Sequence, residues 1–155
     1  MGESMRVYLV IIDETEEALV ALRFASRRAA KTGGGLHLLA LVPQQEFSAF
    51  AAVQATIEEE ARARAESLVH GVAGSLMSEG GKLPKISVRM GEGEKVVRQY
   101  LTEHPEVSAL VLGMAKDGAP GPLVAYFTGA HAAQLPCPVF LIPGSLTTED
   151  IERLS

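Results

Sequence analysis

One stretch near the end of the chain limits the possible fold more than any other. Residues 107–143, VSALVLGMAKDGAPGPLVAYFTGAHAAQLPCPVFLIP, contain two short apolar runs, Leu110–Leu112 and Val139–Ile142, in which polar residues do not alternate. Such strands are typical of a parallel sheet that is covered on both faces. A glycine-rich turn and a helical pattern separate the two runs. The turn, Gly113 to Pro122, follows the end of a predicted strand, where open α/β sheets bind ligands.

Apolar runs alternate with helical patterns along the rest of the chain. This order predicts an α/β fold with three layers, α/β/α, around a doubly wound, five-stranded parallel sheet. Right-handed crossovers would place helices on both faces of that sheet. The run Ile86–Met90 alternates between apolar and polar residues, so it predicts an edge strand. The other early strands are predicted at Val7–Ile12 and Leu36–Val42, and the early helices at about 15–31, 55–78 and 94–103.

The length of the chain predicts a single domain over residues 1–155. A chain of 155 residues can bury one core, and it contains no internal repeat, low-complexity tract or linker. Residues 144–155 are polar and are expected to form a C-terminal tail, with a short helix capped by Thr147 or Thr148.

Composition and charge exclude several classes of partner. The net charge is −5 and the sequence has no basic block, so a nucleic-acid partner is not expected. No apolar run approaches the length needed to cross a membrane, and the N-terminus lacks a signal-peptide pattern. A cytoplasmic location is therefore the expectation. The one cysteine, Cys137, cannot form an internal disulfide and is expected to be a small buried apolar residue.

The motifs for common chemistries fail when their spacing is tested. Gly113 and Gly118 have the spacing of the two P-loop glycines, but Ala119 and Pro120 stand where lysine and a hydroxyl residue belong. The four histidines have no metal-ligand spacing, and no G-x-S-x-G sequence is present. The sequence therefore predicts no catalytic group and no metal site, and leaves open whether the protein is an enzyme.

Asp13 is the polar residue that best fits a binding role, because it follows the first strand at the expected edge of the sheet. Glu16 follows three residues later, and such a pair is also typical of a capping box, so Asp13 is equally expected as a helix N-cap. Lys116, in the turn after the fourth strand, is a candidate for contact with an anion.

The strand ends and turns together resemble those of the universal stress proteins, in the adenine nucleotide α-hydrolase-like group of folds. The similarity covers Val7 to Pro143 and is carried by the first strand with Asp13, the Met90-Gly91 turn and Ala109-Leu-Val-Leu-Gly113. The sequence Leu135-Pro-Cys-Pro-Val139 before the last strand is its most specific part. This resemblance implies the strand order 3-2-1-4-5 and a homodimer formed through the last strand.

The nucleotide-binding branch of this family has the motif G-x2-G-x9-G-S/T after the fourth strand. Gly113 matches the first glycine, but Lys116 stands at the second, and the last pair falls near Ala125 and Tyr126. The resemblance implies that Asp13 and the backbone around Val42 would face adenine and ribose, and Gly113 a phosphate. The candidate cofactor-binding residues are Ile12, Asp13, Val42, Gly113, Lys116 and Gly118, and the candidate cofactor is ATP or another adenine nucleotide.

Three functions are compatible with this sequence. The first is a dimeric regulatory or stress-response module with a degenerate nucleotide loop and weak or absent ATP binding. The second is a true adenine-nucleotide binder that uses Lys116 and Gly118 in an altered loop. The third is a small hydrolase or transferase with its site at the same edge. The apolar last strand, Val139–Ile142, has no charge to guard its edge, which favours pairing with a second copy. Client proteins cannot be named from the sequence.

Overall fold

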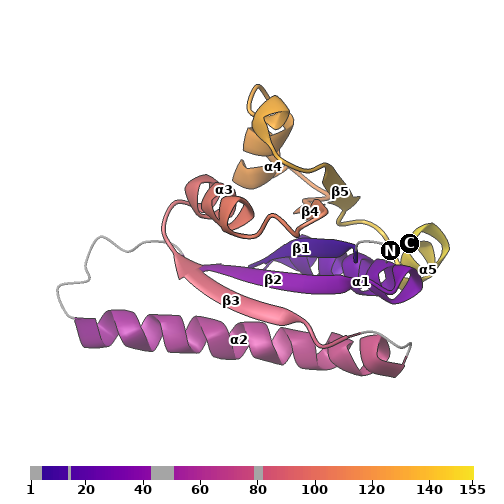
Figure 1. Ribbon diagram of the computed structural model, residues 1–155, viewed down its shortest axis with the longest axis horizontal. Helices are drawn as coiled ribbons and strands as arrows, with labels where there is room; N and C mark the ends of the chain where they lie inside the picture. The colour runs from indigo at the N-terminus through magenta and orange to yellow at the C-terminus, as the bar shows by residue number, and fades with distance from the viewer. Residues whose placement is uncertain (1–4, 14, 43–50, 79–81) are drawn as a thin grey trace.

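The computed structural model describes residues 5–13, 15–42, 51–78 and 82–155. These residues form a parallel sheet of five strands in the order β3-β2-β1-β4-β5, as the resemblance implied (Figure 1). The strands are β1 (Val7–Ile12), β2 (Gly35–Val42), β3 (Lys85–Met90), β4 (Ala109–Met114) and β5 (Val139–Pro143). The helices are α1 (Glu16–Thr32), α2 (Ala51–Ser78), α3 (Gly93–Glu103), α4 (Pro122–Thr128) and α5 (Thr148–Leu154), with a 3-10 turn at Ala132–Gln134.

Two apolar clusters, one on each face of the sheet, form the core. Alternate residues of β1 enter different clusters: Tyr8 and Val10 pack with α1, α2 and α5, whereas Leu9 and Ile11 pack with α3 and α4. The run without alternation thus belongs to a strand that is buried on both faces, as predicted. Figure 1 shows α2 on one side of the sheet and α3 and α4 on the other.

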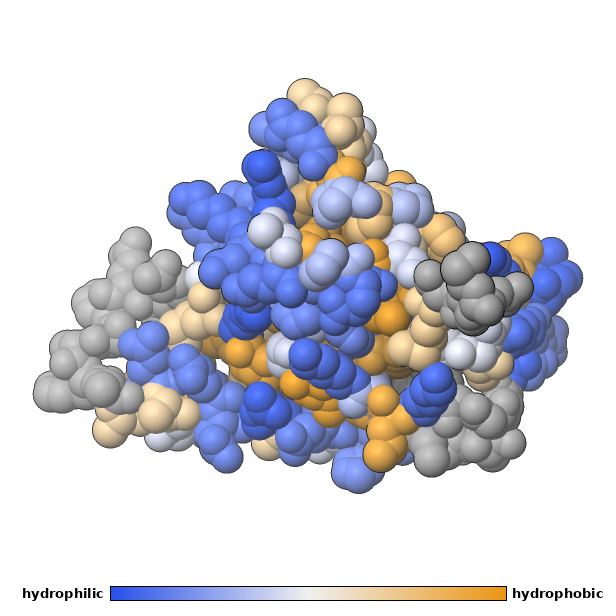
Figure 2. Space-filling view, in the orientation of Figure 1, coloured by the Kyte–Doolittle hydropathy of each residue, from blue (hydrophilic) through white to orange (hydrophobic). Residues whose placement is uncertain are grey.

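The strand β3 lies at an edge of the sheet, as its alternating pattern predicted. Five of its six residues are partly buried and none is fully buried. In Figure 2 the surface of α2 and α3 is mainly hydrophilic, and apolar side chains appear between these two helices, where β3 lies in Figure 1.

The segment expected to be a polar tail is a helix that packs against α1. Thr147 is the N-cap of α5 and forms a capping box with Asp150, and Ile151 is only 2% exposed. The Lys31 ammonium donates to the carbonyl of Glu152 at 2.8 Å, and Arg28 donates to that of Ser155 at 3.2 Å. The sequence predicted the helix and its cap but missed this docking.

Candidate functional site

The chain builds the sheet in one direction from β1 to β3 and in the other direction from β4 to β5. The strand order therefore reverses between β1 and β4, which are hydrogen-bonded neighbours. The helix that follows β1 packs on one face and the helix that follows β4 packs on the other, so their loops separate at the carboxyl edge. A cleft of about 350 Å³ lies at this point, between residues that include Ile11, Leu41, Gly113 and Leu123. This switch-point cleft is where open α/β sheets bind ligands.

Asp13 lies at the edge of the cleft, as predicted, but it is not the N-cap of α1. The N-cap is Thr15, whose hydroxyl oxygen accepts a hydrogen bond from the Ala18 amide at 3.2 Å. The Asp13 Oδ1 atom accepts in turn from the Thr15 amide at 2.9 Å and from the Thr15 hydroxyl. The capping box expected between Asp13 and Glu16 was therefore wrong, because the N-cap lies two residues after Asp13. Asp13 instead orients the residue that caps the helix.

Gly113 also lines the switch-point cleft, and its identity has a packing reason. A Cβ atom at this position would lie 2.5 Å from the carbonyl carbon of Glu17 and closer still to its oxygen. Real Cβ atoms do not approach backbone atoms so closely, so β4 can pass the first turn of α1 only with glycine here. The match of Gly113 to the nucleotide motif thus has a structural explanation that does not require a phosphate.

The side chains of Ile12 and Val42 lie on the other face of the sheet. Both line a separate pocket of about 230 Å³ beneath α2. The neighbouring residues Ile11 and Leu41 line the switch-point cleft in their place. Successive side chains of a strand point to opposite faces of the sheet, so neighbouring residues line different pockets.

Lys116 and Gly118 are not brought together with Asp13 and Gly113 in the cleft. Both are exposed in the loop between β4 and α4, and neither lines the cleft. Gly118 has φ 76°, in the left-handed region that glycine adopts most readily, so it serves the turn. The part of this loop that reaches the cleft is Pro120 to Pro122.

The chemical character of the switch-point cleft is apolar and acidic. Asp13, Glu17 and Glu94 contribute carboxylates, and no positively charged residue lines the cleft in the part of the chain that the structure describes. Pro120 and Pro122 have no amide hydrogen to donate. Sequence reasoning missed Glu17 and Glu94. They lie in the first turns of α1 and α3, where acidic residues are common because they favour the start of a helix.

The described residues contain no metal site and no membrane helix. No group of three or more His, Cys, Asp or Glu side chains is placed to hold an ion in residues 5–13, 15–42, 51–78 and 82–155. No helix among these residues is long and apolar enough to cross a membrane. Cys137 is partly buried, and burial raises the pKa of its thiol, so the reactive thiolate is disfavoured.

A cluster of titratable groups lies at the amino end of β2, away from the cleft. The Tyr100 hydroxyl and His37 Nδ1 are 2.9 Å apart, and His104 stacks on the Tyr100 ring. Burial lowers the pKa of His37, with smaller contributions in the same direction from Lys85 and His104, against an opposing one from Glu106. Neutral His37 can accept the Tyr100 hydrogen bond, whereas protonated His37 cannot accept it at Nδ1.

Stability should therefore fall as the pH falls. A His37 pKa below its unfolded value of about 6.5 means that the unfolded chain binds the proton more tightly. The contribution of neutral His37 is present above about pH 6.5 and is lost as the pH falls toward the folded-state pKa. Urea unfolding at pH 7.5 and pH 5.5 should show this loss, and His37→Asn should reduce it. The exposed His70, changed to Asn, is the control, and an equal reduction there would contradict the assignment.

Comparison with known proteins agrees with the architecture of the sheet. The sequence model of the universal stress protein family matches residues 5–143. No curated protein matches the sequence significantly. Among solved structures, the universal stress protein UspA from Lactobacillus plantarum is 19% identical, with a TM-score of 0.69 over 91% of this chain and 99% of that chain. A universal stress protein from Burkholderia pseudomallei is 20% identical, with a TM-score of 0.64 over 92% of this chain and 99% of that one.

A third similar structure contains a ligand. The universal stress protein from Archaeoglobus fulgidus in complex with dAMP is 17% identical, with a TM-score of 0.55 over 89% of this chain and 97% of that chain. At these identities the structures establish the shared fold alone. The family match covers most of the sequence, from the residues before β1 to the end of β5. The chain therefore belongs to the universal stress protein family.

Proposed function

We propose that this universal stress protein is a regulatory module, without catalytic activity, that binds ATP weakly or not at all. The acidic lining of the switch-point cleft supports this proposal. ATP would bring about four negative charges to a cleft lined by Asp13, Glu17 and Glu94. Two like charges about 7 Å apart repel by about 2 kcal/mol at an effective dielectric constant near 20. A repulsion of this size lowers affinity by more than tenfold.

The loop after β4 also lacks the features that would offset this repulsion. Lys116 is the lysine closest in sequence to the cleft residues of this loop, and it does not line the cleft. Pro122 occupies the first position of α4, and with Pro120 it reduces the number of amide donors. Phosphate sites normally rely on such donors together with a cation or a metal ion.

Calorimetric titration with adenosine, AMP and ATP tests the proposal. We expect no nucleotide to remain bound after purification and no heat at about 1 mM ATP, because repulsion grows with the phosphate charge. The variant Glu94→Gln should strengthen ATP binding relative to the natural protein. The matched variant Glu59→Gln, on the exposed side of α2, should not.

Co-purified ATP, or a micromolar dissociation constant, would contradict weak binding. The protein would then be an adenine-nucleotide binder, like the Archaeoglobus relative solved with dAMP. Turnover of a nucleotide or ester that is abolished by Asp13→Ala would instead favour the hydrolase or transferase function.

We also propose that the protein forms a homodimer through β5. This strand lies at the edge of the sheet, and its residues Val139, Phe140 and Leu141 are only partly buried in the single chain. An unguarded apolar edge favours pairing with another strand. Pairing of two β5 strands would cover this edge in both copies.

Light scattering during size-exclusion chromatography checks the dimer. The expected mass is twice the 16.5 kDa of one chain, and Leu141→Lys should shift it toward the monomer by placing a charge at the edge. Ser145→Lys, at an exposed position just after the strand, should leave the dimer intact. A natural protein that is monomeric at about 100 μM, where a typical dimer with a nanomolar to micromolar dissociation constant is formed, would overturn this proposal.

A further inference from the structure

The walls of the switch-point cleft are mainly apolar. Its volume of about 350 Å³ is at the small end of the range of known small-molecule sites, about 300–1,000 Å³. Leu41 from β2 and Leu123 from α4 converge beside Gly93, because a Cβ atom at Gly93 would lie 3.4 Å from a methyl carbon of Leu41 and 3.2 Å from one of Leu123. Ile11 and Val124 also line the cleft. The cleft can therefore remove one small apolar group from water.

Two carboxylates at this cleft have no positive partner within the structure. Glu17 and Glu94 are partly buried, and in the part of the chain that the structure describes neither side chain forms an ion pair or a hydrogen bond. Lys95, next to Glu94 in the sequence, pairs with Glu92 at 3.1 Å instead. Lys116 is exposed in its loop and does not line the cleft. The described residues therefore supply no positive side chain to these two carboxylates.

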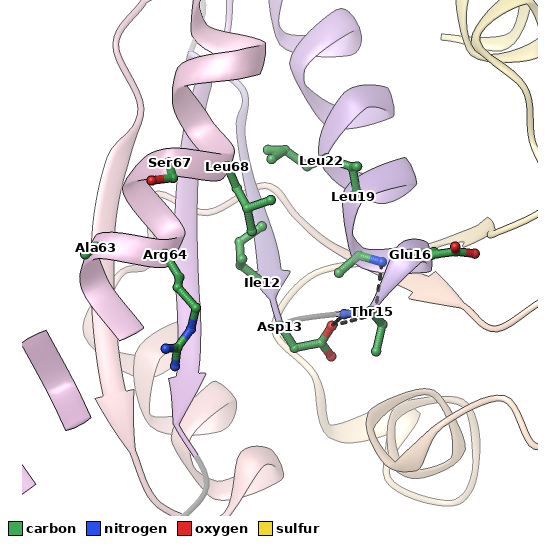
Figure 3. Close-up of a pocket in the computed structure, with 11 residues that line it drawn as sticks. Ile12, Asp13, Thr15, Glu16, Leu19, Leu22, Ala63, Arg64, Ser67 and Leu68 are labelled. Carbon is green, nitrogen blue, oxygen red and sulfur yellow. Dashed lines mark hydrogen bonds between the residues drawn. The ribbon is translucent and has the colours of Figure 1, made fainter. Parts of the chain in front are cut away.

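Asp13 provides a third carboxylate, and one of its oxygens is available. Its Oδ1 atom accepts hydrogen bonds from the amide and the hydroxyl of Thr15 (Figure 3). Its Oδ2 atom has no hydrogen-bond partner among the residues that the structure describes, and Asp13 is exposed. The side chain of Glu16 points away from Asp13, and Glu16 does not line the cleft. The contact with Thr15 fixes the position of the Asp13 carboxylate, so it can meet a ligand without rearrangement.

The N-termini of three helices reduce the negative charge of the cleft without cancelling it. Thr15 and Gly121, the N-caps of α1 and α4, and Gly93, the first residue of α3, all line the cleft. A helix N-terminus acts as about half a positive charge, so the three together offset about half of the charge of three carboxylates. The remaining charge, about −1.5, is of the size that a singly charged cation balances. The phosphates of ATP would add to it.

We propose that the switch-point cleft binds a small organic cation, in which a primary ammonium group is attached to one apolar ring. The ammonium group can donate three hydrogen bonds, which suits the carboxylates of Asp13, Glu17 and Glu94. The ring lies against Leu41 and Leu123 and is removed from water. This ligand rests on the proposed function, because such an amine would be the small molecule that the regulatory module senses in place of ATP.

Titration of the isotope-labelled protein, followed by the shifts of its backbone amides, tests the inference. The probes share one ring: phenethylamine is a cation, 2-phenylethanol is neutral and 3-phenylpropionate is an anion. We expect saturable shifts at Ile11, Gly93 and Gly113 with phenethylamine, and at least about tenfold weaker binding of the other two, because charge-assisted hydrogen bonds are roughly twice as strong as neutral ones. No saturable shift with phenethylamine at about 10 mM, or equal binding of 2-phenylethanol, would overturn the inference.

Two pairs of variants locate the binding. Glu94→Gln should weaken phenethylamine binding about tenfold, whereas Glu59→Gln, at an exposed position of α2, should not. Leu123→Ala should weaken it at least about threefold by removing apolar contact, whereas Leu83→Ala, at a residue that is 75% exposed, should not. Phenethylamine binding that is unchanged in both Glu94→Gln and Leu123→Ala would place the ligand elsewhere and contradict the inference.

The titrations with ATP and with phenethylamine separate this inference from the proposed function. Weak ATP binding together with saturable phenethylamine binding supports both, and Glu94→Gln should then change the two affinities in opposite directions. Weak ATP binding without phenethylamine binding would overturn the inference alone. Micromolar ATP binding would contradict the proposed function, and with it the acidic character of the cleft on which the inference depends.

Discussion

Replacing Gly113 with alanine is expected to destabilise the protein by about 3 kcal/mol, at the upper end of the usual cost of overpacking. The added Cβ would overlap the carbonyl group of Glu17, which belongs to the backbone of α1 and cannot move aside by a rotamer change. Either β4 or the first turn of α1 must shift, and such overpacking costs about 1–3 kcal/mol or more. Urea unfolding followed by circular dichroism measures the change in the free energy of unfolding.

Gly71→Ala is the matched control for this experiment. Gly71 lies in α2, and a Cβ there meets nothing within 4 Å. Removing a helical glycine should therefore stabilise the protein by about 0.5–1 kcal/mol. The same substitution is thus expected to act in opposite directions at the two positions. A loss of less than about 1 kcal/mol for Gly113→Ala would show that β4 does not need this close approach.

Replacing Phe127 with alanine is expected to lower the free energy of unfolding by about 3–5 kcal/mol. Phe127 is 1% exposed, and it is one of only two fully buried residues of α4, the other being Val124. A helix of seven residues has little stability of its own, so its position depends on this packing. Loss of the ring should also loosen Pro122 and Leu123, which line the switch-point cleft.

Two measurements separate packing from local opening. Urea unfolding gives the global loss, and hydrogen exchange of the α4 amides reports the local one. The neighbouring Ala125→Ser, at an exposed position of the same helix, should change stability by less than about 0.5 kcal/mol. Equal losses for Phe127→Ala and Ala125→Ser would mean that α4 is not anchored through its buried ring.

The fold could be predicted from the sequence because its strands carry unusually direct signals. Val7–Ile12 is apolar at every position, and only a strand with both faces covered needs that pattern. Glycine and proline mark the ends of most elements, so the predicted boundaries fall close to the observed ones. The packing of α5 could not be predicted in this way. It depends on one buried apolar residue, Ile151, and on hydrogen bonds with residues of α1 that are distant in the sequence.

The positions of the candidate site residues could be predicted from the sequence only in part. Asp13 and Gly113 follow the ends of adjacent strands, so the topology alone brings them to one edge. The side chains of Ile12 and Val42 face away from the cleft, and those of Ile11 and Leu41 line it, because resemblance aligns strand ends without fixing which face each side chain takes. The acidity of the cleft was missed because Glu94 belongs to α3, the helix that follows β3. The predicted site residues came only from the ends of β1, β2 and β4 and the loops after them.

Asp13 lines the switch-point cleft and also a second cavity of about 580 Å³ between α1 and α2, on the opposite face of the sheet. Two molecules bound at these places would share the field of one carboxylate and the loop that holds it. Their affinities would then be linked thermodynamically: the factor by which the first changes the affinity of the second equals the factor by which the second changes that of the first. Through this single side chain at the end of β1, a ligand bound on one face of the sheet would change the affinity for a ligand on the other face.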